Sequence, residues 1–291
     1  MTHRPQTSTQ HLRMLHNKND VRISIVMGMY NCESTIGNAI KSVVNQTFTQ
    51  WELIMCDDAS TDNTLKIAET FLLQYPDKIK LLRNTDNKRL AFTLNRCLEL
   101  AQGKYIARMD ADDCSLPQRL EAQFNYLENH PEIDCVGTSR YVDDGTGAIS
   151  IRDAREEVSP SLLLNGVPFA HPTILIKRSV MKELGGYTVS KETQRAEDLD
   201  LWFRFFAAGY KGANIKEPLY LYRETKADYK KRTISAALGT AFVFAKGYKL
   251  LNIPIYQRWR CLRPILSALL PTKFMYWYHK IKDKPSVKND V

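Results

Sequence analysis

Short apolar, β-branched runs alternate with amphipathic stretches over about the first 130 residues of the chain. The runs predict strands, and the stretches between them, with apolar residues three and four positions apart, predict helices. Repetition at this spacing predicts a parallel, doubly wound α/β sheet, which binds ligands beyond the carboxyl ends of its strands. The expected strands are 22–27, 52–56, 79–82 and 105–109, and the expected helices begin near Ser34, Asp62, Leu90 and Ser115.

The pattern changes after Glu132. Two β-rich runs on either side of Asp144-Gly145 predict a hairpin, and the helical stretches that follow end at glycines. We expect strands at 135–142, 149–152, 173–176 and 220–222, helices at 178–184 and 199–208, and, from Tyr229 onward, helices interrupted at Pro254, Pro264 and Pro271.

Three carboxylates follow the fourth expected strand, in the run Asp110-Ala111-Asp112-Asp113. At this spacing they repel one another unless a cation or solvent compensates their charge. Carboxylate oxygens suit Mg²⁺ or Mn²⁺, and these ions keep positions open for the phosphate oxygens of a ligand. The run therefore predicts a metal that holds a phosphorylated ligand at the edge of the sheet. The alternative is an acidic turn ahead of a helix.

Positive charge is concentrated toward the end of the chain. The chain has 41 Lys and Arg against 32 Asp and Glu, and from Arg223 onward there are 15 against four, so the rest is close to neutral. The basic residues of this tail alternate with Trp, Tyr and Phe, which is typical of a helix at an anionic lipid surface. A helical cap packed on the body is the alternative. Nucleic-acid binding is disfavoured because no recognition fold is present.

Other features indicate a cytoplasmic protein. Residues 1–20 are polar and are expected to form a disordered lead-in, and no run approaches the roughly 18 apolar residues of a membrane span. The six cysteines form no CxxC pair, which favours buried thiols in a reducing compartment. No GxGxxG follows the first strand, so a Rossmann dehydrogenase is disfavoured.

Several motifs, in order and at the expected spacing, together resemble family 2 glycosyltransferases, which are nucleotide-sugar enzymes of the GT-A fold. The motifs are Ser24–Asn31, Cys56–Asp62, Asp110–Asp113, His171-Pro172-Thr173 and Glu197-Asp198. The resemblance extends to a subgroup common in bacterial polysaccharide and lipopolysaccharide gene clusters.

The resemblance implies a division of the chain. A GT-A domain, α/β and Rossmann-like with a mostly parallel central sheet flanked by helices, would span residues 21–225. Its nucleotide-sugar-binding half would be 21–132 and its acceptor-binding half 133–225. Residues 226–291 would form a basic, aromatic, helical C-terminal extension, which would contact the anionic membrane through residues 230–284.

On the donor side, the resemblance implies a UDP-sugar site. Tyr30 would stack on the uracil, and Asp58 would accept the uracil N–H. Asp112 would bind Mn²⁺ or Mg²⁺, while Asp110 would share the metal or lie near the ribose. Lys88 and other cations would lie near the diphosphate. The implied nucleotide-sugar-binding residues are Met29, Tyr30, Asp58, Arg89, Arg108, Asp110 and Ala111.

On the acceptor side, the resemblance makes Asp198 the general base that deprotonates the acceptor hydroxyl, with Glu197 orienting it or holding the helix start. We expect the helix N-terminus to keep the base ionised. Trp202 would form an apolar platform for the acceptor sugar, or else pack in the core. His171 would face the cleft, toward an acceptor phosphate, or serve as a structural hydrogen-bonding group.

These expectations combine into one function. The protein would be a metal-dependent, inverting transferase that moves a single sugar from a UDP-sugar to a glycan acceptor, often lipid-linked, in bacterial surface-polysaccharide assembly. It would act as a peripheral protein on the inner face of the cytoplasmic membrane. The alternative from a different class is a catalytically silent module that binds a nucleotide sugar or the membrane.

Overall fold

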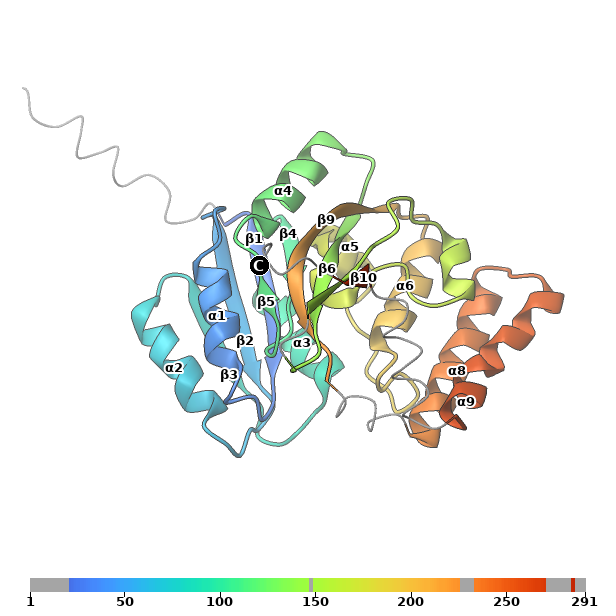
Figure 1. Ribbon diagram of the computed structural model, residues 1–291, viewed down its shortest axis with the longest axis horizontal. Coiled ribbons are helices and arrows are strands. Elements are labelled where there is room, and N and C mark those ends of the chain that lie inside the picture. Colours follow the sequence, from blue (N-terminus) through green and yellow to red (C-terminus); the bar gives the residue numbers. More distant parts are fainter. Residues whose placement is uncertain (1–20, 147–148, 226–232, 271–283, 286–291) are drawn as a thin grey trace, which may run out of the picture.

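The computed structural model describes residues 21–146, 149–225, 233–270 and 284–285. Its strands form one sheet, in the order β10-β7-β6-β8-β4-β1-β2-β3, with β9 beside β6 and β5 beside β9. Helices cover this sheet on both faces, and α8 and α9 lie at the opposite end of the molecule from α2 (Figure 1). The expected α/β fold class is confirmed.

The first half of the sheet is parallel, as predicted. Its strands are β1 (Ile23–Met29), β2 (Trp51–Asp57), β3 (Ile79–Arg83) and β4 (Tyr105–Arg108), connected by α1 (Ile36–Val44), α2 (Thr64–Gln74) and α3 (Leu90–Leu100). All seven residues of β2 are buried, because helices cover both faces of a parallel sheet. Successive residues of β1 therefore enter two different cores. Val26 joins the core that contains Leu94 of α3, while Ile25 joins the core that contains Ile40 of α1.

The second half is mixed rather than parallel. β8 (Leu175–Lys177) runs antiparallel to β4 and to β6 (Cys135–Asp143), and β6 forms the predicted hairpin with β7 (Ile149–Arg152). The remaining elements here are β5 (Cys114–Ser115), α4 (Arg119–Asn129), the short 3₁₀ turns η1 (Pro160–Leu164) and η2 (His171–Thr173), α5 (Arg178–Glu183), α6 (Glu197–Ala207) and β10 (Lys284–Pro285). Parallel pairing therefore holds throughout β1 to β4 and between β6 and β9, whereas the other pairs are antiparallel.

One strand is much longer than predicted. β9 spans Gly212–Arg223 and runs parallel to β6, whereas the sequence pattern indicated only residues 220–222. Lys216, Glu217 and Pro218 interrupt the apolar alternation. The register shifts on either side of Ser139, the residue opposite Pro218, so the strand continues through an irregularity that accommodates the proline.

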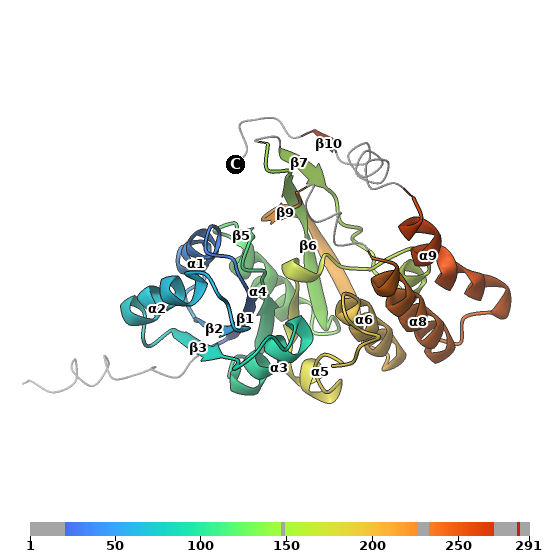
Figure 2. The ribbon, with the colours of Figure 1, turned by 90° about the horizontal axis from the view of Figure 1, so that it is seen from below.

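The described part of the tail packs on α6. α8 (Ile234–Leu250) is followed by η3 (Ile255–Leu262) and α9 (Arg263–Ala268), at the far end of the molecule in Figure 2. Gly247 allows close approach, since a Cβ there would lie 2.2 Å from the ring of Phe203. Pro254 separates two helices as predicted, but Pro264 lies in the first turn of α9, where its missing N–H is tolerated.

Several expectations fall on residues that the structure does not describe. These are the polar lead-in 1–20, the boundary near 226–232 and the interruption at Pro271. Within the described ranges, no helix combines the length and apolar character needed to span a bilayer. All six cysteines are free thiols, and Cys56, Cys97 and Cys135 are buried.

Candidate active site

A cavity of about 900 Å³ opens at the carboxyl edge of the sheet. It brings together seven of the predicted residues from distant parts of the chain: Lys88, Arg89, Arg108, Asp110, His171, Glu197 and Asp198. The start of α8 and the end of β9 complete its walls, through Ala236 and Tyr222 among others. The other predicted residues, Met29, Tyr30, Asp58, Ala111, Asp112 and Trp202, do not line it.

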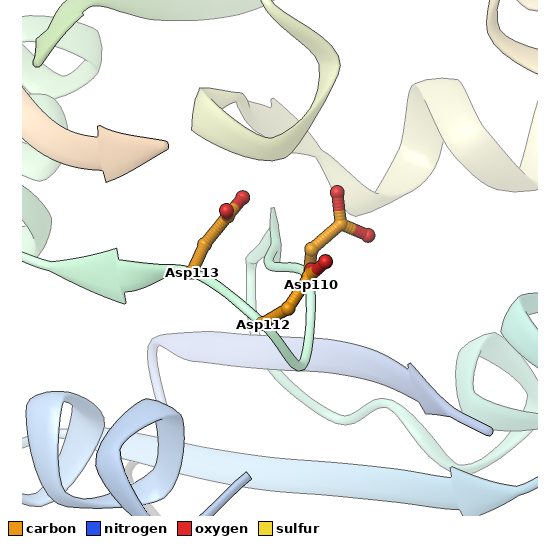
Figure 3. A group of neighbouring side chains, drawn as sticks. All are labelled: Asp110, Asp112 and Asp113. Carbon is orange, nitrogen blue, oxygen red and sulfur yellow. The ribbon is translucent and has the colours of Figure 1, made fainter. Parts of the chain in front are cut away.

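Asp110, Asp112 and Asp113 form an acidic cluster directly after β4. One carboxylate oxygen of each lies within 4.8 Å of the others, and all three project from a single turn (Figure 3). Asp112 is exposed, whereas Asp113 is 2% exposed and accepts the backbone N–H of Arg223 at 2.8 Å. The other oxygen of Asp113 has no hydrogen-bond partner in the described chain. Burial raises the pKa of Asp113 well above its usual value, and Asp110 and Asp112 add to this. Three hard carboxylate oxygens this close together fit a divalent cation.

Arg108 forms a two-pronged ion pair with Asp110. The guanidinium is buried, which opposes its charge, but Asp110 and nearby tyrosines raise the pKa of Arg108 above its ordinary value. We expected Arg108 to lie near a diphosphate, and the structure instead engages it with a carboxylate of the acidic cluster. Arg108 therefore fixes the orientation of Asp110 within the cluster.

Asp58 organises the loop between β3 and α3. Its buried carboxylate accepts the backbone N–H groups of Lys88 at 2.8 Å and Arg89 at 2.9 Å, and the side-chain amide of Asn84 at 2.7 Å. These bonds hold Arg89 at φ 72°, a left-handed conformation that is costly for a residue with a side chain. A carboxylate has about four acceptor positions, so one position is left for a further donor such as a uracil N–H.

Three other residues of the predicted donor site differ in exposure. Tyr30 is 50% exposed directly after β1, so a ring face can receive a base. The side chain of Met29 is buried in the core, which leaves only its backbone for the expected contact with the nucleotide. Its backbone carbonyl instead accepts the N–H of Asp58 at 2.8 Å. The methyl group of Ala111 is also buried.

Glu197 and Asp198 begin α6 and face the cavity. Burial raises the pKa of Glu197 to about 7, and the adjacent Asp198 adds to this shift. Burial also raises the pKa of Asp198, against the opposing effects of the Leu199 N–H, 2.7 Å from its Oδ1, and of Arg108. We expected the helix start to keep Asp198 ionised. The backbone N–H groups there do lower its pKa, but burial raises it by more. Both carboxylates are shifted toward the range in which a side chain exchanges protons at neutral pH.

Trp202 does not form a platform for an acceptor. Its side chain is 0% exposed and lies in the core, 4.5 Å from the ring of Phe169 and 5.7 Å from that of Phe205 between centroids. Core packing, the alternative expected for Trp202, is the one observed, because one helical turn from Asp198 leads under the cavity wall rather than along it. Trp202 instead supports Phe169 and His171, two residues that line the cavity.

His171 is held as a neutral ring. Its Nε2 lies 2.9 Å from the hydroxyl of Tyr187, and burial, with a smaller contribution from Arg108, lowers its pKa well below the usual value. A neutral imidazole offers a phosphate a hydrogen bond but no charge. The structural alternative therefore accounts for His171 better than attraction of an acceptor phosphate.

Sequence patterns gave no sign of several residues at this site. Arg119 in α4 is buried and donates hydrogen bonds to the carbonyls of Arg108, at 2.9 Å, and Ile174, at 3.3 Å. Arg140 of β6 and Arg152 of β7 line the cavity, as does Glu224 just after β9. In the sequence, each of these is simply a charged residue in or beside an apolar stretch. Such a residue is usually exposed to solvent, so nothing marked it as part of a site.

An α/β sheet with an acidic cluster at its carboxyl edge is the arrangement expected from the resemblance to glycosyltransferases. The sequence matches the family described as glycosyl transferase family 2 over residues 24–185, which is more than half of the chain. The chain belongs to this family and is a glycosyltransferase.

Named relatives and solved structures agree with this assignment. The chain is 41% identical to the putative glycosyltransferase EpsE of Bacillus subtilis, over 89% of this chain and 93% of that protein. It is 31% identical to WfgD of Escherichia coli, over 63% and 69% respectively. WfgD is named as a UDP-Glc:α-D-GlcNAc-diphosphoundecaprenol β-1,3-glucosyltransferase.

The fold is similar to two solved structures of low sequence identity. One is S. aureus TarS in complex with UDP-GlcNAc, with a TM-score of 0.59 and 17% identity over 86% of this chain and 82% of that one. The other is the mannosyltransferase PcManGT of Pyrobaculum calidifontis with GDP-Man and Mn²⁺, with a TM-score of 0.59 and 19% identity over 89% and 79%.

Proposed function

We propose that this glycosyltransferase moves a single sugar from a UDP-sugar to a lipid-linked glycan acceptor, with inversion and with a divalent metal, in the assembly of a bacterial surface polysaccharide. The observation that carries the proposal is one cavity that is lined both by Asp110 of the acidic cluster and by Glu197 and Asp198 of α6. The substrates given in the name of WfgD support a UDP-sugar donor and a lipid-diphosphate acceptor.

Asp112 and Asp110 would hold Mn²⁺ or Mg²⁺. The bound ion would neutralise charge on the departing diphosphate. The protein prepares this site in advance, because Arg108 orients Asp110 and the Arg223 N–H holds Asp113. Lys88 and Arg89, placed at the cavity edge by Asp58, would contact the phosphate oxygens.

Asp198 would take the proton from the acceptor hydroxyl as that oxygen attacks the anomeric carbon. Attack from the face opposite the departing UDP inverts the configuration, through a transition state with oxocarbenium character. Glu197 lies next to Asp198, and the Asp198 carboxylate contributes to the raised pKa of Glu197.

Replacement of the base tests this assignment. Asp198→Asn should reduce transfer from UDP-sugars by at least about 100-fold, while calorimetry finds UDP affinity in Mn²⁺ nearly unchanged. Asp77→Asn, an exposed carboxylate beyond α2, is the matched control. Near-normal transfer by Asp198→Asn would show that another group is the base.

A panel of UDP-Gal, UDP-Glc, UDP-GlcNAc and UDP-GalNAc identifies the donor, and failure to release UDP from any of them would favour a silent binding module.

A membrane surface is the last part of the proposal. Nine large apolar residues on α8, η3 and α9 and directly after α9 are each more than half exposed: Ile234, Leu238, Phe242, Ile255, Tyr256, Trp259, Leu262, Leu266 and Leu269. Arg258, Arg260 and Arg263 lie in the same segment. Apolar side chains among arginines suit an anionic lipid surface. Because Thr233 and Ala236 of the same segment line the cavity, docking through this face would bring the cavity to the lipid surface.

A further inference from the structure

A ring of buried hydrogen bonds joins Asp58 to Asn84, Thr93 and Arg89. Asn84 Nδ2 donates to Asp58 Oδ1 at 2.7 Å and to the Thr93 hydroxyl at 3.1 Å. The Thr93 hydroxyl donates in turn to the Arg89 carbonyl at 2.9 Å, and the Arg89 N–H donates to Asp58 Oδ2 at 2.9 Å. Asp58, Asn84 and Thr93 are each at most 4% exposed, so water competes little for these bonds. The ring therefore gives the Asp58 carboxylate a fixed support.

Arg96 of α3 determines which end of the Asn84 amide faces Asp58. Its guanidinium donates to Asn84 Oδ1 at 2.7 Å and to the Arg83 carbonyl at 2.8 Å. A guanidinium only donates hydrogen bonds, and an ionised carboxylate only accepts them. A reversed amide would therefore set its NH₂ against the guanidinium and its oxygen against the carboxylate. Because both contacts favour the same orientation, Asn84 presents a donor to Asp58.

The ring leaves Asp58 one position for a ligand. Oδ1 accepts two hydrogen bonds, from Asn84 and from the Lys88 N–H at 2.8 Å, whereas Oδ2 accepts only the Arg89 N–H among the described residues. Oδ2 can therefore accept one more. Tyr30 directly follows β1 and Asp58 directly follows β2, and these strands pair in parallel. A flat ligand stacked on the half-exposed Tyr30 ring would then present its edge to this acceptor.

We propose that Asn84, held by Arg96 and Thr93, keeps Asp58 as a hydrogen-bond acceptor and thereby makes the site select uridine over cytidine diphosphates. Asn84 is a positioning residue, since it acts through Asp58. This inference rests on the proposed function, in which a UDP-sugar is the donor. Uracil carries an N–H between its two carbonyls, whereas cytosine has an unprotonated nitrogen at that position. Against a fixed acceptor, the cytosine nitrogen sets two lone pairs facing each other, which weakens binding.

Calorimetry on the full chain in Mn²⁺ tests the proposal with three probes. They are UDP, CDP and methyl-UDP, in which a methyl group replaces the hydrogen of that ring N–H. The wild-type protein should bind UDP at least about tenfold more tightly than either of the others. Asn84→Leu has nearly the same size but cannot donate, so the Asp58 carboxylate is free to turn or to bind a proton. The preference for UDP over CDP should then fall at least about tenfold.

Thr93 provides a second, independent pair of variants. Thr93→Val keeps the shape but loses the hydroxyl that receives Asn84 Nδ2, so it should lower the preference for UDP over CDP at least about threefold. Thr93→Ser keeps the hydroxyl and should keep the preference. Asn45→Leu, an exposed asparagine directly after α1, is the matched control for Asn84→Leu and should bind all three probes as the wild type does.

The ratio of affinities separates positioning from a merely structural role. An equal loss of UDP and CDP affinity in Asn84→Leu, or an unchanged preference in Thr93→Val, overturns the proposal. Equal binding of UDP and methyl-UDP by the wild type also overturns it. If a UDP-sugar is transferred while the preference ignores Asn84, this inference fails and the proposed function stands. If no UDP-sugar is transferred but the preference still depends on Asn84 and Thr93, the proposed function fails and the uridine selection stands.

Discussion

Glu197 offers a test of the site that does not depend on knowing the substrate. Its pKa is raised to about 7, first by burial and then by the adjacent Asp198. In the unfolded chain the same side chain titrates near 4.5. The folded state therefore holds a proton over a pH range in which the unfolded state has lost it, so this residue lowers the stability of the fold as pH rises.

The size of the effect follows from the shift. A pKa raised from 4.5 to about 7 corresponds to about 3 kcal/mol of destabilisation above pH 7, and almost none at pH 4. The loss of stability develops between these two values. Glu197→Gln removes the charge while keeping nearly the same shape, so it should raise the free energy of unfolding by up to about 3 kcal/mol at pH 8 and by less than about 0.5 kcal/mol at pH 4.

Urea denaturation followed by tryptophan fluorescence at pH 4, 6 and 8 measures this difference without metal or donor. Glu69→Gln, an exposed carboxylate on α2, is the control and should show no gain that grows with pH. An equal change at pH 4 and pH 8 in Glu197→Gln would refute the reasoning, because a packing effect is independent of the charge. A loss of stability at pH 8 would mean that the ionised carboxylate is favourably paired in the folded protein.

Three further predictions concern the metal, the core and the membrane surface. Asp112→Asn should abolish the Mn²⁺ dependence of UDP binding in calorimetry, whereas Glu121→Gln on α4 should keep it. Trp202→Ala should cost about 3–5 kcal/mol of unfolding free energy in urea, because it empties a fully buried site, and a cost below about 1 kcal/mol would contradict that burial. Trp259→Ser should reduce flotation of the full chain with anionic vesicles. Leu73→Ser, which also replaces an exposed apolar residue but lies on α2, is the control, and equal flotation of the two variants would contradict the proposed membrane surface.

Local patterns predicted the parallel half of the sheet well because each strand there is a short, mostly apolar run between two amphipathic helical stretches. All seven residues of β2 are buried, and five of them are apolar, so the pattern of that strand was clear in spite of Glu52 and Asp57. The pattern failed at β9, where Lys216, Glu217 and Pro218 are tolerated by a register shift that only the pairing with β6 creates. Strand pairing of this kind is a property of two distant segments, and neither segment alone predicts it.

The candidate site could be predicted where neighbouring residues in the sequence have the chemistry of a site. It could not be predicted where a role depends on which way a side chain points in the folded protein. The acidic run after β4 showed its chemistry in four consecutive residues. Trp202 was misassigned because helical spacing gives the angle between two side chains but not which side of α6 faces the cavity. Arg140 and Arg152 escaped notice because their shared place in the cavity wall arises from cross-strand register, which brings together residues twelve positions apart.

The position of the acidic cluster depends on a buried polar network that ties the two halves of the sheet together. Arg119 donates to the carbonyls of Arg108, where β4 ends, and Ile174, beside β8. The Tyr220 hydroxyl of β9 accepts the backbone N–H of Asp110 at 3.2 Å, and the Arg119 guanidinium lies 4.9 Å from the Tyr220 ring. Burial lowers the pKa of Arg119 to about 10, which still leaves it charged at neutral pH. Burying the Arg119 charge costs desolvation free energy, and its hydrogen bonds offset that cost. They also fix the turn that bears the three carboxylates before any ligand binds.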